Sequence, residues 1–156
     1  MRMNRPRAVT TSVLAAAVAS LTALFGCYEP TEPYHTDDPD YHTDIDLARE
    51  AWLATHPLEY TFEVARASSW FAESGYKQVE VSEGIVVSAT DPNGRPIEGF
   101  SLTLDTLWTY ALTARTSGEL NSALFDSQGV PIEVDWGRWE VDGGVRYRVQ
   151  DFARLR

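Results

Sequence analysis

Side chains that could act as bases or nucleophiles are few in this sequence. Its three histidines are His35, His42 and His56, and the first two lie in an acidic segment rich in proline. A Ser-His-Asp triad needs a histidine held inside the fold, so these positions do not favour one. The HExxH, GxSxG and P-loop patterns are also missing. We therefore assign no catalytic residue and no cofactor from the sequence.

Carboxylates are the remaining candidates for acid–base chemistry. Glu133 and Asp135 alternate with apolar residues and so share one face of an expected strand, and Asp126 and Asp142 could lie nearby. A glycosidase needs two carboxylates that face each other across a cleft, about 5–10 Å apart. The same alternation is the ordinary pattern of a half-buried antiparallel strand with a solvent-facing side, which is the interpretation we prefer. An Asp- or Glu-dependent envelope hydrolase is the alternative.

A pair of large aromatic residues, Trp70 and Phe71, lies in an expected polar loop over residues 67–75. Exposed aromatic side chains in a loop can anchor a partner molecule. The loop can also fold back so that Trp70 closes the edge of the core, because large aromatic side chains are mostly buried. We favour the core interpretation and keep Trp70 and Phe71 as candidate partner-binding residues.

The only cysteine, Cys27, follows a segment that is typical of a secretory signal. Residues 1–7 are cationic, residues 8–26 carry no charge, and the segment ends Leu24-Phe25-Gly26. This end is similar to the lipobox of bacterial lipoproteins. The similarity implies cleavage before Cys27 and a diacylglycerol and palmitate-type acyl anchor on its sulfur. Residues 1–26 are then the signal peptide, and the mature protein is attached to a membrane of the bacterial cell envelope.

Two other interpretations of this N-terminal segment remain open. Its 19 uncharged residues are just long enough for an uncleaved transmembrane helix, although serines and threonines reduce its apolarity. Cys27 can also be an incidental thiol. A lipid anchor is favoured because the one thiol of the chain stands where acylation requires it. The domain would then face the periplasm, or lie outside the plasma membrane if there is no outer membrane.

Residues 27–43 are expected to be an acidic tether. The segment holds Pro30, Pro33 and Pro39 and almost no aliphatic side chain, so it cannot bury enough apolar area to offset the cost of ordering. The tetrapeptide Tyr-His-Thr-Asp occurs at 34–37 and again at 41–44. Histidine and aspartate are metal ligands, but a flexible segment offers no fixed geometry. We favour a duplicated spacer and assign no metal.

The net charge of −10 argues against nucleic acid as a partner, because phosphate binding requires clustered lysine and arginine. A single cysteine also excludes an intramolecular disulfide.

Residues 44–156 have the patterns of one globular domain. Apolar residues recur at helical spacing in two segments and at strand spacing in six. The expected order is helix, three strands, helix, three strands, over residues 45–55, 60–65, 77–81, 85–89, 104–117, 120–125, 130–136 and 145–152. Strands joined by short turns run antiparallel. We expect an α+β fold, with two helices packed on one face of a curved antiparallel sheet in the order α-βββ-α-βββ.

This domain resembles a bacterial family of exported proteins and lipoproteins called domain of unknown function 6174. The order and spacing of several short patterns carry the resemblance: Trp52 through Tyr60-Thr61-Phe62-Glu63, Val79-x-Val81-x-x-Gly84-x-Val86-Val87-Ser88-Ala89, Thr103-Leu104-Asp105-x-Leu107-Trp108, and Phe125-Asp126 through Gly129-x-Pro131-Ile132-x-Val134-Asp135. Members often carry a cysteine pair where this chain has 68–71 without cysteine, so no redox or metal role is carried over. The resemblance implies an exported domain of this fold and no particular activity.

Together these patterns predict a lipid-anchored envelope protein without a catalytic site, which binds or scaffolds another envelope protein or polymer. The alternatives are the Asp- or Glu-dependent hydrolase and an inhibitor-like binder of a periplasmic enzyme.

Overall fold

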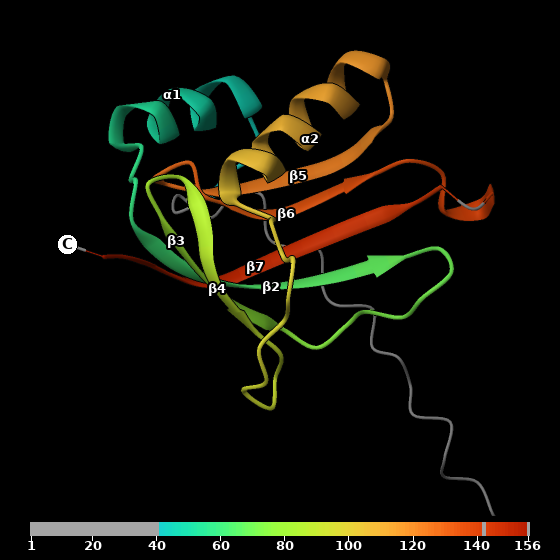
Figure 1. Ribbon diagram of the computed structural model, residues 1–156. Helices are drawn as coiled ribbons and strands as arrows, with labels where there is room; N and C mark the ends of the chain where they lie inside the picture. Colours follow the sequence, from blue (N-terminus) through green and yellow to red (C-terminus); the bar gives the residue numbers. More distant parts are fainter. Residues whose placement is uncertain (1–40, 142, 156) are drawn as a thin grey trace, which may run out of the picture. The chain divides into compact units, whose positions relative to one another are not determined.

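The computed structural model describes residues 41–141 and 143–155 (Figure 1). The expected signal peptide, Cys27 and the tether as far as residue 40 lie outside the described residues, as does Asp142. In chain order the elements are β1 (Tyr41–His42), α1 (Ile45–Thr55), β2 (Tyr60–Ser68), β3 (Lys77–Ser82), β4 (Ile85–Thr90), α2 (Leu104–Ser117), β5 (Leu120–Asp126), β6 (Pro131–Trp136), the 3-10 helix η1 (Trp139–Val141) and β7 (Val145–Arg154).

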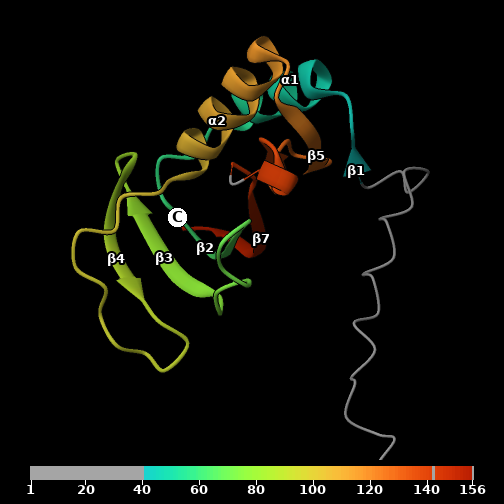
Figure 2. The same cartoon turned by 90° about the vertical axis from the view of Figure 1, so that its right-hand side faces the viewer.

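These strands form one antiparallel sheet in the order β1-β5-β6-β7-β2-β3-β4. Both helices lie on the same face of the sheet, and α2 packs against β5 and β6 (Figures 1 and 2). The expected α+β fold and its order of elements are confirmed. Strand β1 is an addition, because Tyr41 and His42 of the segment expected as a tether pair with Asp126 and Phe125 of β5.

Local signals in the sequence begin and end the helices. Asp44 caps α1, and its side chain accepts hydrogen bonds from the backbone N–H groups of Asp46 (2.9 Å) and Leu47 (3.3 Å). Thr103 caps α2 and forms a reciprocal capping box with Thr106. Gly118 ends α2 in the left-handed conformation, with φ of 73°, which glycine adopts without a steric penalty.

The core lies between the helices and the sheet. Trp108 of α2 stacks on Phe125 of β5 with ring centroids 4.4 Å apart, and its indole N–H donates to the carbonyl of Gly129 at 3.1 Å. A Cβ atom at residue 129 would collide with the backbone carbonyl of Ala48 in α1. Glycine therefore lets α1 approach the turn between β5 and β6 closely.

The edge strand β4 differs from the simple alternation of its sequence. A bulge between β3 and β4 shifts the pairing by one residue, so that Val79 pairs with Ala89 but Val81 pairs with Val86. As a result Ala89 is buried, whereas Ile85 and Val87 are 68% and 58% exposed. Strand periodicity alone places all three on one face, and the bulge is the physical reason that they separate.

Tyr60 links the sheet to the start of α2. Its side chain is buried, and its hydroxyl oxygen accepts a hydrogen bond from the backbone N–H of Leu104 at 3.2 Å. Burial raises the pKa of the Tyr60 phenol to about 12, because a phenolate loses its hydration inside the core. The neutral phenol is therefore the form that the fold accommodates.

We expect Tyr60→Phe to lower the free energy of unfolding by about 1–2 kcal/mol at neutral pH, because the Leu104 N–H loses its acceptor. The phenol has a higher pKa in the folded state than its ordinary value of 10.0. Its contribution to stability is therefore complete below pH 10 and is lost as the pH rises toward 12. Urea unfolding of both proteins from neutral to alkaline pH measures this. If the free energy of unfolding falls equally steeply with rising alkaline pH in the variant and in the wild-type protein, the role of Tyr60 is contradicted.

Candidate functional site

The aromatic pair Trp70–Phe71 is exposed in the turn that follows β2. Trp70 is 67% exposed and Phe71 is 74% exposed, so the expectation that Trp70 closes the core edge is wrong. The turn is held by backbone hydrogen bonds between Ser68 and Phe71 (3.0 and 3.1 Å) and from Ser69 N–H to the carbonyl of Gly144 (3.0 Å). Because the backbone fixes the turn, neither aromatic side chain is needed to close it.

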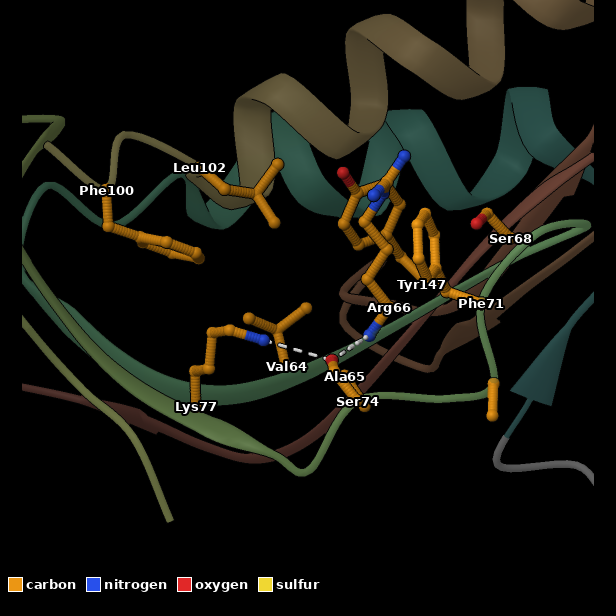
Figure 3. Close-up of a pocket in the computed structure, with 11 residues that line it drawn as sticks. Val64, Ala65, Arg66, Ser68, Phe71, Ser74, Lys77, Phe100, Leu102 and Tyr147 are labelled. Atoms are coloured by element: carbon orange, nitrogen blue, oxygen red, sulfur yellow. Dashed lines mark hydrogen bonds between the residues drawn. The ribbon is translucent and has the colours of Figure 1, made fainter. Parts of the chain in front are cut away.

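Phe71 is also part of the wall of a cavity of about 300 Å³ on the helix side of the sheet (Figure 3). Most of the wall is apolar. The lining comes from the end of β2, the segment after it, the start of β3, the segment that leads into α2, and the start of β7: Val64, Ala65, Arg66, Ser68, Phe71, Ala72, Ser74, Lys77, Phe100, Leu102 and Tyr147. Residues that are far apart in the sequence therefore share one site.

Strand pairing brings the polar side chains of this wall together. Arg66 of β2 lies directly opposite Tyr147 of β7, and Val64 lies directly opposite Lys77 of β3. Directly opposed residues project to the same face of a sheet. The register of β3, β2 and β7 thus places Arg66, Lys77 and Tyr147 around the cavity.

The described residues that line the cavity include two cations and no carboxylate. Among the described residues neither Arg66 nor Lys77 forms an ion pair. The ammonium of Lys77 donates to the hydroxyl oxygen of Ser74 at 3.0 Å, which also accepts from the backbone N–H of Arg66 at 3.1 Å (Figure 3). In a chain with a net charge of −10, this lining is locally cationic.

Tyr147 continues the cavity wall toward α2. Its ring lies 5.8 Å from the ring of Trp136 and 6.2 Å from that of Tyr110, and the guanidinium carbon of Arg66 lies 6.0 Å from its centroid. Burial raises the pKa of the Tyr147 phenol, although the nearby charge of Arg66 opposes this shift. The neutral phenol offers the cavity both a donor and an acceptor.

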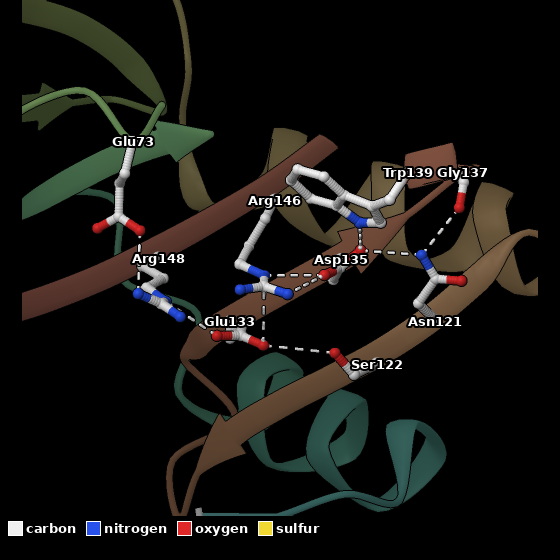
Figure 4. A network of polar contacts seen from close by, with 9 residues as sticks. All are labelled: Glu73, Asn121, Ser122, Glu133, Asp135, Gly137, Trp139, Arg146 and Arg148. Atoms are coloured by element: carbon white, nitrogen blue, oxygen red, sulfur yellow. Dashed lines mark hydrogen bonds and ion pairs between the residues drawn. The ribbon is translucent and has the colours of Figure 1, made fainter. Parts of the chain in front are cut away.

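The opposite face of β6 and β7 carries a network of charged side chains (Figure 4). Asp135 is only 3% exposed. Its Oδ1 accepts from Asn121 Nδ2 (2.9 Å) and Trp139 Nε1 (2.7 Å), and its Oδ2 accepts from two nitrogens of Arg146 (2.8 and 2.7 Å). The expectation that Asp135 faces solvent is therefore wrong, because four donors replace its hydration.

Glu133 belongs to the same network. Its carboxylate lies 3.0 Å from Nε of Arg148, which also contacts Glu73 at 2.9 Å. Glu133 and Asp135 share a strand face as expected, but each is bound to a guanidinium group of β7. This arrangement stabilises the sheet and leaves no carboxylate pair that faces an open cleft from β6.

Asp126 has a structural role in the turn between β5 and β6. Its Oδ1 accepts hydrogen bonds from the backbone N–H groups of Gln128 and Val130, both at 2.8 Å. Asp126 and Asp151 also border a shallow hollow of about 350 Å³, in which Asp151 is exposed. The hollow therefore does not give its carboxylates the apolar surroundings that a general acid needs.

His56 also takes part in a helix contact. Its Nε2 lies 3.0 Å from Oδ1 of Asp105, which accepts the indole N–H of Trp52 at 3.1 Å. This contact ties the end of α1 to the start of α2. No nucleophilic side chain bonds to His56 among the described residues.

In the part of the chain that the structure describes, no group of three or more His, Cys, Asp or Glu side chains could hold a metal ion. None of the described helices has the length and apolarity to span a bilayer.

No family model matches the chain, and no curated protein matches it. The resemblance to domain of unknown function 6174 stays a prediction based on the residue patterns of the chain.

Sequence patterns identified Trp70 and Phe71 but missed Arg66, Lys77 and Tyr147. The alternating pattern predicts a strand over residues 60–65, but β2 continues to Ser68 and therefore includes Arg66. Nothing in the local sequence connects these three residues. Only the pairing of three strands brings them into one cavity.

Proposed function

We propose that this protein is a non-catalytic, lipid-anchored binding domain of the bacterial cell envelope. The observation that carries the binding role is the exposed pair Trp70–Phe71, of which Phe71 lines a cavity whose described lining residues include two cations and no carboxylate. Exposed aromatic side chains next to a concave apolar site are typical of binding surfaces. The envelope location rests on Cys27 and the signal-like segment before it.

The arrangement of the carboxylates supports binding over hydrolysis. Glu133 and Asp135, the best hydrolase candidates of the sequence, hold arginines of the neighbouring strand. Asp126 is engaged with backbone N–H groups of its own turn. Among the described residues, the lining of the cavity includes no carboxylate that could act as acid, base or nucleophile.

The lipid anchor predicts where the protein is found in a bacterial host. Each buried methylene of an acyl chain contributes about 0.8 kcal/mol, so several chains on Cys27 would hold the domain firmly to a membrane. We expect the mature wild-type protein in the membrane fraction, with an acylated N-terminal cysteine by mass spectrometry. Cys27→Ser should abolish acylation and cleavage before residue 27. A free thiol on Cys27 in a chain that retains Met1 would overturn the anchor.

The aromatic pair predicts a loss of binding without a loss of stability. Because both side chains are exposed, Trp70→Ala and Phe71→Ala should change the free energy of unfolding by less than about 0.5 kcal/mol. Each immobilised variant should capture several-fold less of the envelope component that the wild-type protein retains. Ile85→Ala, which removes an equally exposed side chain outside the cavity lining, is the matched control. Equal capture by all variants would contradict the proposed surface.

A further inference from the structure

The size of the cavity limits its occupant. A volume of about 300 Å³ lies at the lower end of the usual range for small-molecule sites. One short acyl chain or one small ring system fits a site of this size.

The wall of the cavity favours an apolar body. Val64 is buried at its floor, and Phe100 and Leu102 are partly buried against the same core. Phe71, which is 74% exposed, extends the apolar wall toward solvent.

The polar groups of the cavity favour an anionic end. The ammonium of Lys77 has three donors, and among the described residues it donates one hydrogen bond, to Ser74. The guanidinium of Arg66 lies over the ring of Tyr147, with no carboxylate partner among the described residues. By contrast, Arg146 and Arg148 of β7 are already paired with carboxylates. Arg66 and Lys77 thus retain charge and donors for a ligand.

We infer that the cavity binds a small amphipathic anion, with an apolar chain or ring between Val64, Phe71, Phe100 and Leu102 and a carboxylate or phosphate group at one of the two cations of the lining, Arg66 or Lys77. This inference rests on the proposed binding role and adds the class of ligand. A neutral analogue gains the same apolar contacts but no charge-assisted hydrogen bonds. A positively charged amphiphile is repelled by both cations.

Photo-crosslinking of the full chain tests the ligand class. The protein is made in a bacterial host and reconstituted into phosphatidylcholine nanodiscs, so that its anchor is retained. Diazirine-bearing analogues of decanoate, decyl phosphate and decanol are the probes, and mass spectrometry maps the labelled peptides. We expect the two anions to label peptides that line the cavity, roughly tenfold or more above decanol, because hydrogen bonds to charged groups are strong.

Two sets of variants control this experiment. Arg66→Gln combined with Lys77→Gln should reduce anion labelling to the level of decanol, whereas Arg49→Gln, an exposed arginine of α1, should leave it unchanged. Thermal unfolding verifies that each variant is folded. Stronger labelling by decanoate or by decyl phosphate identifies the preferred head group. Equal labelling by decanol, labels outside the cavity, or no effect of the double variant would overturn the inference.

The outcome is separable from that of the proposed function. If the cavity takes no anion but Trp70→Ala still loses its envelope component, the ligand class is wrong and the binding surface stands. If neither effect is seen, both proposals fail.

Discussion

The register between β6 and β7 is the constraint on which the candidate site depends. Asp135 lies directly opposite Arg146, and Glu133 lies directly opposite Arg148. Side chains alternate between the two faces of a strand, so a slip of one residue would move Tyr147 away from the helix side. Tyr147 lies between the two arginines in the chain and lines the cavity on the other face. The ion pairs on one face therefore fix the geometry of the binding site on the other.

The two faces of the sheet are covered in different ways. On one face the helices pack over β5 and β6, and the segment with Phe100 and Leu102 borders the part where the cavity lies (Figures 1 and 3). On the opposite face charged side chains and Trp139 shield Asp135 from water (Figure 4). A buried carboxylate is costly unless it is fully bonded, and its four donors meet this requirement. Such a network is one way to select a single register without a second apolar layer.

Structure that depends on neighbours in the chain could be predicted, and structure that depends on distant contacts could not. The helix over 45–55 has its cap and its apolar face within a few turns of sequence, and both are found as expected. The burial of Asp135 depends on side chains from neighbouring strands, so alternation suggested a solvent face instead. The usual burial of large aromatic side chains favours a core position for Trp70, but backbone hydrogen bonds close its turn without this side chain. Arg66 and Lys77 line one cavity only through strand pairing, which no local pattern encodes.

The central claim is that the Asp135–Arg146 pair acts as a unit that fixes β7 against β6. A double-mutant cycle with Asp135→Asn and Arg146→Gln measures this coupling through the free energy of unfolding of the four proteins. A pair that acts as a unit should show a coupling of about 1.5 kcal/mol or more, since close, desolvated charge pairs reach this range. If the changes in the free energy of unfolding caused by the two substitutions add within about 0.5 kcal/mol, the pair does not act as a unit and does not fix β7 against β6.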